Sequence, residues 1–224
     1  MFIKQKNSYI DIITTTFAVV LLLSNIASTK IAALGSMSFD GGLILFPLAY
    51  IFGDILTEVY GYAQARRVIW IGFSMNLLMV LTFWLVGLLP ADPTWGLQDS
   101  YINILSVVPR IVFASLMAYL VGEFSNSYIL AKLKVKTHGK KFWFRAIGST
   151  VIGEGLDTVI FTLVAFLGIL PGSLLLVIGL TNYVVKVLVE MLLLPVTYKI
   201  VHFLKKKEGI DYYDTDTDFS PIGK

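Results

Sequence analysis

The chain has 224 residues, of which 56% are hydrophobic and 15% charged, with a mean hydropathy of +0.77. A soluble domain carries about 25% charged residues, so this composition excludes an ordinary soluble protein and indicates an integral membrane protein. The formal net charge is +3, and the lack of cysteine excludes disulfides, thiol chemistry and cysteine-ligated metal sites.

Six apolar segments follow one another along the chain. They are Ile10–Leu34, Leu43–Tyr60, Val68–Leu89, Ile102–Leu130, Phe142–Leu170 and Ser173–Leu204. Because a spanning helix needs about 20 apolar residues, the pattern predicts an all-α, polytopic membrane protein with six transmembrane helices. We expect one transmembrane domain over residues 1–204 and a polar cytoplasmic tail over residues 205–224. The first segment is too long for a signal-peptide core, so a retained helix is predicted.

The basic residues predict the orientation of these helices. All Lys and Arg residues except Lys30, Arg110 and Lys186 fall on one side of the six-helix arrangement, and the three connections on the other side carry none. Lys and Arg accumulate in cytoplasmic loops, so both termini are predicted to be cytoplasmic. The alternating Asp residues of the tail lack EF-hand spacing, which favours a solvated tail over a cation site.

Nine ionisable side chains lie inside the otherwise apolar segments. They are Lys30, Asp54, Glu58, Arg110, Glu123, Glu154, Asp157, Lys186 and Glu190. A charge near the middle of a spanning helix costs about 2.5–3.5 kcal/mol on insertion scales, so such residues usually pair, line a wet cavity or bind a substrate. The pattern therefore predicts a carrier.

Three polar residues of the last segment share one helix face. Asn182, Lys186 and Glu190 are successive i, i+4 neighbours. Lys186 and Glu190 lie near the midpoint of the segment, roughly 20 Å or more from either end at a rise of 1.5 Å per residue. They form either an intrahelical ion pair or, together with Asn182, one wall of a cavity, and their depth favours the cavity.

Two other segments each carry a pair of acids. Glu154 and Asp157 are three residues apart, so one of them is expected to hold a proton or to face a cation. Asp54 and Glu58 are four residues apart, with Asp54 expected at mid-depth. Glu58 is expected near the cytoplasmic interface, where the pair Arg66–Arg67 offers an alternative partner.

Three further charges are predicted to be structural or gating groups, with substrate contact as the alternative. Lys30 lies near the outer end of the first segment, and Arg110 follows Pro109 in the fourth. Glu123 lies nearer the cytoplasmic end, where the basic loop could meet it. Within the spans acids outnumber cations, which suits a neutral or cationic ligand rich in N–H donors and argues against an anionic one.

Two short motifs recur about 100 residues apart. Ser24-Asn25 recurs as Ser125-Asn126, and Gly53-Asp54 recurs as Gly153-Glu154. Three helices separate the copies, so the pattern is compatible with an inverted 3+3 repeat. In many carriers of that kind the binding site lies at the interface between the two halves.

Four stretches of this sequence resemble the queuosine precursor transporters, a family grouped with the vitamin uptake transporters. They are Ser24–Lys30, Asp54–Tyr62 (DILTEVYGY), Arg145–Phe161 and Asn182–Pro195, and the similarity extends over about residues 10–220. The DILTEVYGY string is the most specific of them.

The resemblance implies a multi-pass protein of the bacterial inner membrane that imports a 7-deazaguanine for tRNA queuosine modification. The substrate would be the cyano precursor preQ0, the aminomethyl precursor preQ1 or the base queuine. Eight residues are expected to bind it: Asn25, Asp54, Glu58, Glu154, Asp157, Asn182, Lys186 and Glu190. A carboxylate would accept the ring N–H and the exocyclic amine, with Glu154 or Asp157 as the first acceptor and Asp54 or Glu190 as the second.

The expected partners are this small molecule and the lipid bilayer, with no nucleic acid, and a homo-oligomer is left open. No cofactor, metal or catalytic residue is expected. The alternative is a substrate-capture subunit for a vitamin or nucleobase-like ligand that works with a separate ATPase, since the chain has no Walker motif. An intramembrane enzyme is less favoured because His138 and His202, the only histidines, lie on the cytoplasmic side.

Overall fold

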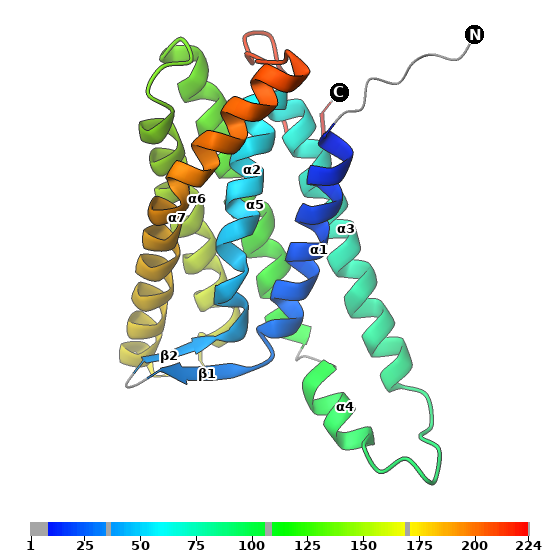
Figure 1. Cartoon of the computed structure of the whole chain (residues 1–224). Helices are drawn as coiled ribbons and strands as arrows, with labels where there is room; N and C mark the ends of the chain where they lie inside the picture. The colour runs from blue at the N-terminus through cyan, green and yellow to red at the C-terminus, as the bar shows by residue number, and fades with distance from the viewer. Residues whose placement is uncertain (1–8, 35–36, 106–108, 169–170, 224) are drawn as a thin grey trace, which may run out of the picture.

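The computed structural model describes residues 9–34, 37–105, 109–168 and 171–223. Its helices and strands are α1 (Ile10–Ala27), β1 (Ile31–Leu34), β2 (Met37–Asp40), a 3-10 turn (Gly41–Ile44), α2 (Phe46–Tyr60), α3 (Tyr62–Gly87), α4 (Gln98–Leu105), α5 (Pro109–Lys136), α6 (Phe142–Phe166) and α7 (Gly172–Glu208). Figure 1 shows α1, α2, α3, α5, α6 and α7 as an upright bundle, with α4 and the β1–β2 hairpin at its lower end.

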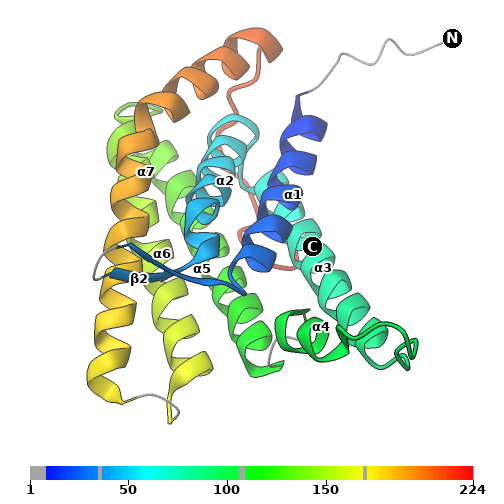
Figure 2. The same cartoon turned by 60° about the horizontal axis from the view of Figure 1, so that its bottom comes forward.

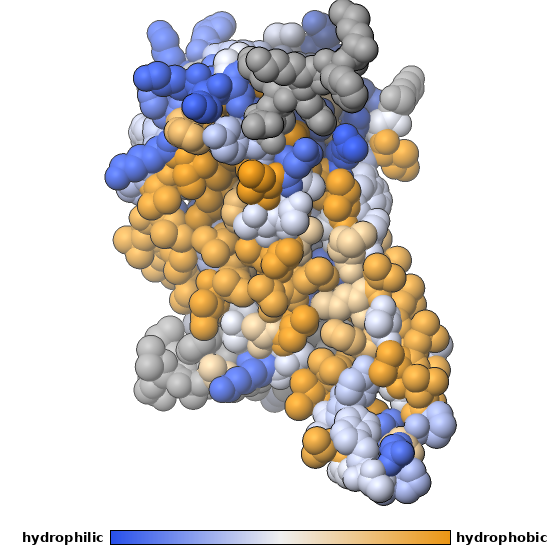
Figure 3. All heavy atoms as spheres, turned by 45° about the vertical axis from the view of Figure 1, so that its right-hand side comes forward, coloured by the Kyte–Doolittle hydropathy of each residue, from blue (hydrophilic) through white to orange (hydrophobic). Residues whose placement is uncertain are grey.

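The bundle has the composition of a multi-pass membrane protein. Among the described residues, α1, α3, α6 and α7 are each long and apolar enough to cross a bilayer. The shorter α2, with 15 residues, and α5 lie among them in both views of the ribbon (Figures 1 and 2). Figure 3 shows apolar side chains covering the middle of one face, while hydrophilic side chains gather at the upper end.

The connections divide between the two ends of the bundle. The α2–α3 junction, the α5–α6 loop and the C-terminal end of α7 lie at the upper end, where α1 also begins. At the α2–α3 junction Gly61 has a φ of 85°, a conformation that favours glycine, so α3 begins directly at Tyr62. The predicted segments leave residues 61–67 as a connection, but residues 62–67 form the first turns of α3 instead.

The bundle is helical, as predicted, but the predicted end of the first segment at Leu34 is wrong, because a short β-hairpin follows α1. The first helix ends at Ala27 instead of continuing to Leu34, and β1 pairs antiparallel with β2, with Ile31 opposite Asp40. The polar residues Ser28, Thr29 and Lys30 interrupt the apolar run at this point, which explains why the helix does not continue.

Two other boundaries depend on proline. The predicted segment 102–130 is divided into α4 and α5, and α5 begins at Pro109, since proline fits the first turn of a helix. The 37-residue α7 contains Pro195, and Figure 2 shows the helix bending so that its last part crosses the upper end of the bundle. The part before Pro195 remains upright beside α6.

The central helix of the bundle is α2. Twelve of its 15 residues are buried, including Ile55, Leu56 and Val59, which pack against Phe17 of α1 and Ile69 of α3 in the apolar core. Because α2 is enclosed on nearly all sides, its two acids, at positions 54 and 58, are buried as well. Each of them therefore has to find partners on the helices that surround α2.

Candidate functional site

Five carboxylates and one lysine are buried together inside the bundle, and we call them the central acid cluster. They are Asp54 of α2, Glu123 of α5, Glu154 and Asp157 of α6, and Lys186 and Glu190 of α7. None of the five acids is more than 6% exposed, and Lys186 is 9% exposed. The convergence of polar groups from several helices, which the sequence predicted, is thus present in the structure.

Lys186 joins α7 to α6. Its Nζ lies 3.2 Å from a carboxylate oxygen of Glu154 and 2.9 Å from one of Asp157. It also lies 3.9 Å from the centre of the Phe46 ring at the start of α2, where a cation–π interaction adds to the ion pairs. The lysine therefore serves as the cation that the Glu154–Asp157 pair was expected to face.

The alternative of an intrahelical Lys186–Glu190 ion pair is wrong. Lys186 turns toward α6, and the carboxylate of Glu190 instead accepts a hydrogen bond from the hydroxyl of Thr150. Asn182, one turn before Lys186, is partly buried. Its role in binding stays a prediction.

Asp54 is hydrogen-bonded to the side-chain amide of Asn126, a residue that was not among the predicted site residues. The Nδ2 of Asn126 donates a hydrogen bond of 2.9 Å to Oδ1 of Asp54, and both side chains are buried. The recurrence of Ser-Asn at positions 125–126 was the one sequence signal that pointed to Asn126, but it did not indicate that Asn126 would bond to Asp54.

Glu123 belongs to the cluster rather than to the cytoplasmic end. Its side chain is fully buried and reaches α2 beside Gly53, the residue before Asp54. The expectation that the basic loop meets Glu123 is wrong, because no cation among the described residues forms an ion pair with it.

Three glycines let the helices approach closely around this cluster. A Cβ on Gly53 would lie 2.8 Å from Oε2 of Glu123, one on Gly122 would lie 2.6 Å from the Tyr50 hydroxyl, and one on Gly153 would lie 2.9 Å from Cβ of Asn126. At Gly122 and Gly153 a Cβ would also meet the backbone of the facing helix, at 3.1 and 3.0 Å, so the packing requires glycine there, whereas at Gly53 only the flexible end of the Glu123 side chain would have to move.

The cluster is closed in this conformation. The crevice between α6 and α7 beside Thr150 and Glu190 is too narrow to admit a water molecule. A ligand the size of a bicyclic base could therefore reach the acids only after the helices move apart.

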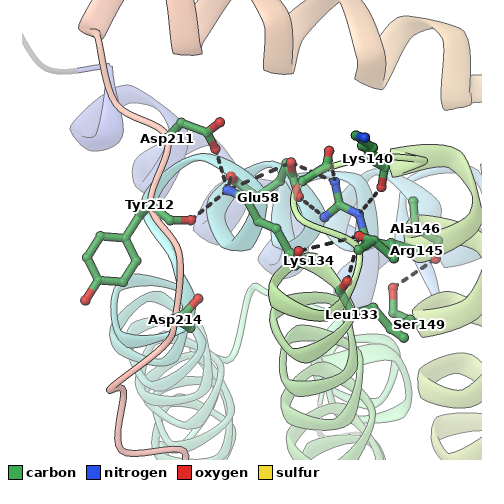
Figure 4. Close-up of polar contacts among 12 residues, drawn as sticks. Glu58, Leu133, Lys134, Lys140, Arg145, Ala146, Ser149, Asp211, Tyr212 and Asp214 are labelled. Carbon is green, nitrogen blue, oxygen red and sulfur yellow. Dashed lines mark hydrogen bonds and ion pairs between the residues drawn. The ribbon is translucent and has the colours of Figure 1, made fainter.

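A second polar group, which we call the Glu58 network, begins one helical turn after Asp54 on α2, and Figure 4 shows its contacts. Glu58 is 1% exposed, and its carboxylate accepts hydrogen bonds of 2.5 and 3.1 Å from Arg145 and one of 2.6 Å from Lys205. The Nζ of Lys134 donates to the backbone carbonyl of Glu58 at 2.5 Å. The network links α2, α5, α6 and α7 at the upper end of the bundle.

The predicted pairing of Glu58 with Arg66 or Arg67 is wrong for a geometric reason. Arg145 lies in the first turn of α6 and Lys205 in the last turn of α7, and both cations donate to the carboxylate of Glu58. Arg66 lies on α3 and instead donates hydrogen bonds to the carbonyls of Asp218 and Ser220 in the tail.

Most residues of the tail are exposed, as a solvated tail requires, but the tail is also docked on the bundle by specific contacts. Asp211 pairs with Lys134 at 2.6 Å and with Lys205 at 2.9 Å. Partial burial raises the pKa of Asp211, but the hydrogen bonds from the two lysines outweigh this effect and the pKa is lowered. Both carboxylate oxygens of Asp214 accept from the backbone N–H of Tyr62 at 3.1 Å, which caps the first turn of α3.

The remaining predicted residues lie apart from these groups. Asn25 donates to Oδ1 of Asn76 at 2.6 Å and accepts from Ser115 at 3.2 Å, so it links α1 with α3 and α5. Lys30 follows α1 and is exposed. The side chain of Arg110 lies outside the described residues, so its role stays a prediction. Within the described ranges no group of three or more His, Cys, Asp or Glu is arranged to hold a metal ion.

Comparison with known proteins gives three similar relatives and one family. The family model described as "Putative vitamin uptake transporter" matches residues 40–200. The "Probable queuosine precursor transporter" of Bacillus subtilis (strain 168) is 32% identical over 178 residues, which cover 78% of this chain and 77% of that protein. The "Queuosine precursor transporter" of Escherichia coli (strain K12) is 25% identical over 171 residues, 74% of each chain.

The third relative, from Haemophilus influenzae (strain ATCC 51907 / DSM 11121 / KW20 / Rd), is also named "Probable queuosine precursor transporter". It is 24% identical over 140 residues, which cover 62% of this chain and 57% of that protein. No solved structure matches the chain.

Proposed function

The chain belongs to the vitamin uptake transporter family, and from this premise we propose that it imports 7-deazaguanine precursors of queuosine across the bacterial inner membrane. The names of its relatives support this substrate class. We further propose six spans, formed by α1, α2, α3, α5, α6 and α7, with both termini in the cytoplasm. The common position of the basic loops at the upper end of the bundle supports this orientation.

The observation that carries the proposal is the central acid cluster. Its residues come from four helices and lie far from either end of the bundle: Lys186 is 14 residues beyond the start of α7, or about 21 Å at a rise of 1.5 Å per residue. Burying this many charges in a membrane protein is costly, and their usual role is to bind what the protein transports.

The chemistry of the cluster matches a guanine-like ring. Such a ring presents a ring N–H and an exocyclic amine on one edge, which a carboxylate accepts as a pair of hydrogen bonds. We propose that Glu154 or Asp157 is the first acceptor and that Asp54 or Glu190 is the second. Lys186, already beside both residues of the first pair, would donate to the carbonyl of the base.

The ring faces of the substrate would need flat apolar partners. Tyr50 is fully buried among the acids of the cluster, and its hydroxyl approaches α5 at Gly122, where an added Cβ would lie 2.6 Å from it. Phe46, 5.9 Å from Tyr50 between ring centres, already lies against Lys186. A planar base entering between α2 and α6 would therefore meet aromatic surfaces beside the carboxylates, and stacking would add to the polar recognition.

Passage to the cytoplasm would require the Glu58 network to open. This network lies between the cluster and the cytoplasmic end, and its bonds tie together the four helices that enclose the cluster. We propose that it acts as the cytoplasmic seal. The direct contact of Asn126 in α5 with Asp54 in α2 fits a site between two halves, as an inverted repeat predicts.

The test is uptake of labelled preQ0, preQ1 and queuine by cells that lack queuosine synthesis, scored also by modified tRNA. Four variants, D54N, E154Q, D157N and E190Q, remove one carboxylate charge each while keeping its shape. The matched control is D92N, because Asp92 is an exposed loop acid whose carboxylate accepts hydrogen bonds from the neighbouring Thr94 and lies outside the helical bundle.

We expect at least a tenfold loss of uptake in one or more of the four variants and none in D92N, since one lost charge-assisted hydrogen bond costs about 1.5–3 kcal/mol. Membrane abundance of each variant is measured in parallel. Undiminished uptake in all four would disprove the assignment of the site. Uptake of none of the three compounds by the unmodified chain would disprove the function.

A further inference from the structure

A pocket of about 430 Å³ opens at the surface of α3, far from the central acid cluster. It lies at the end of the bundle that carries the basic loops, because its first lining residue, Ala63, belongs to the first turn of α3. Nothing in the proposed transport mechanism uses it.

The pocket is built from two adjacent rows of α3 side chains. Arg67, Ile71 and Met75 form one row at i, i+4 spacing, and Trp70 and Ser74 belong to the row beside it. From Arg67 to Met75 the helix rises about 12 Å at 1.5 Å per residue. The lining is therefore charged at the cytoplasmic end and becomes mainly apolar about 12 Å further along the helix, toward the middle of the bilayer.

The docked tail supplies the remaining wall. Nη1 of Arg66 donates to the carbonyls of Asp218 and Ser220 at 2.9 and 2.8 Å, and Nε1 of Trp70 donates to the carbonyl of Pro221 at 2.7 Å. These bonds place Ile222 beside the pocket.

The positive charge of the pocket is available to a ligand. Arg67 is exposed, and neither it nor Arg66 forms an ion pair with any residue that the structure describes. The guanidinium of Arg66 is oriented by the tail carbonyls, whereas that of Arg67 lies open at the mouth.

We propose that this pocket binds an anionic phospholipid of the cytoplasmic leaflet, with its phosphate at Arg67 and an acyl chain along α3. The row that contains Ser74 continues to Leu78, which is 58% exposed, so an apolar track leads from the pocket toward the membrane centre. Trp70 lies at the level where tryptophan meets the headgroups in membrane proteins.

A lipid fits this surface better than a soluble phosphate compound does. The pocket has both a cation and an adjoining apolar track, and the track lies on a helix that is itself apolar enough to cross the bilayer. Basic pockets on the cytoplasmic side of transmembrane helices recognise anionic headgroups in this manner. The inference uses the orientation proposed above but not the identity of the transported substrate.

A bound lipid would also hold the tail in place. Its headgroup at Arg67 would lie beside Arg66 and Trp70, whose hydrogen bonds to the carbonyls of Asp218, Ser220 and Pro221 anchor the tail. Because Asp211 of the same tail contributes to the Glu58 network, the lipid would indirectly support the proposed cytoplasmic seal.

The test uses the purified full chain reconstituted with phosphatidylcholine and increasing amounts of phosphatidylglycerol brominated on its acyl chains, which quenches nearby tryptophan fluorescence. Brominated phosphatidylcholine is the reference lipid. The W70F variant identifies the part of the quenching that arises at the pocket. R67Q removes the headgroup contact, and K136Q, which removes the charge of an exposed lysine at the same end, is the matched control.

We expect the Trp70 component to be quenched more strongly by brominated phosphatidylglycerol than by brominated phosphatidylcholine. R67Q should reduce this preference about fivefold, the factor that corresponds to about 1 kcal/mol per basic residue near a membrane surface. K136Q should leave it unchanged, and size-exclusion profiles confirm that each variant is folded.

Equal quenching by the two lipids, or an undiminished preference in R67Q, would overturn the proposal. Relief of quenching by millimolar glycerol phosphate would also overturn it, by showing that the pocket takes a soluble phosphate compound. Transport activity plays no part in the readout, so the outcome is independent of the proposed function.

Discussion

Replacing Lys186 by methionine should destabilise the bundle by removing the cation that two buried acids share. The Nζ atom lies 3.2 Å from Glu154 and 2.9 Å from Asp157, whose side chains are 0% and 5% exposed. Removal of one partner of a buried ion pair costs about 3–5 kcal/mol, because the charges that remain are buried without compensation. Methionine keeps the length and most of the volume of the lysine side chain, so the change isolates the charge.

The measurement is the thermal unfolding of the purified protein in detergent. For a chain of this size, 1 kcal/mol shifts the melting temperature by about 2–4 °C, so K186M should melt about 6–20 °C below the unmodified protein. K199M is the matched control, because Lys199 lies on the same helix but is exposed, and its melting temperature should change by less than 2 °C.

A second set of variants tests the cause of the effect. In K186M/E154Q/D157N the two acids are neutral as well, so at least half of the lost melting temperature should return. If K186M melts within 2 °C of the unmodified protein, or if the triple variant is less stable than K186M, the shared ion pairs do not stabilise the bundle.

Three further predictions concern the cytoplasmic end. Because the chain has no cysteine, the buried position 127 can be labelled specifically in an S127C variant by a membrane-impermeant maleimide added from the cytoplasmic side. Labelling should be at least tenfold faster when E58Q is also present, since charge-assisted hydrogen bonds of about 1.5–3 kcal/mol are lost. Equal labelling rates would refute the proposed seal. D214A removes the cap on the Tyr62 N–H and should cost about 1 kcal/mol of stability, seen as a lower melting temperature, while an unchanged value would show that the cap contributes nothing. The pKa of Asp211 is lowered in the folded state, so the carboxylate contributes its full stabilisation above the unfolded pKa of about 3.9 and loses it as the pH falls through the lower folded pKa. The difference in melting temperature between D211N and the unmodified protein should therefore be present at pH 7 and shrink below about pH 4. A difference that grows on acidification would contradict this expectation.

The spanning helices could be predicted because the apolar runs are long and nearly free of charge. The predicted start of α6 at Phe142 agrees with the structure, and the predicted start of α1 at Ile10 does so too. The errors occur where backbone geometry rather than hydropathy decides. The positive φ of Gly61 lets α3 begin directly after α2, and hydropathy carries no information about such a junction.

The partners within the site were less predictable than its members. Spacing placed Lys186 and Glu190 on one face correctly, but it could not show that Lys186 would turn to α6. The spacing within one helix reveals only i, i+3 and i, i+4 contacts, whereas a buried side chain can also find its partner on a neighbouring helix. Asn126 was missed as a partner for the same reason, because its hydrogen bond joins residues 72 positions apart.

The spacing of two acids on α2 connects the site with its seal. Asp54 and Glu58 are one helical turn apart, so they lie about 6 Å from each other along the axis. Asp54 bonds to α5 within the central acid cluster, whereas Glu58 bonds to Arg145 of α6 and Lys205 of α7 at the cytoplasmic end. Since α2 is a continuous and almost fully buried helix, it cannot shift relative to α5, α6 and α7 at one of these levels without straining the bonds at the other. Substrate binding at Asp54 would thereby act on the seal at Glu58 through α2 itself, with no need for a longer chain of contacts.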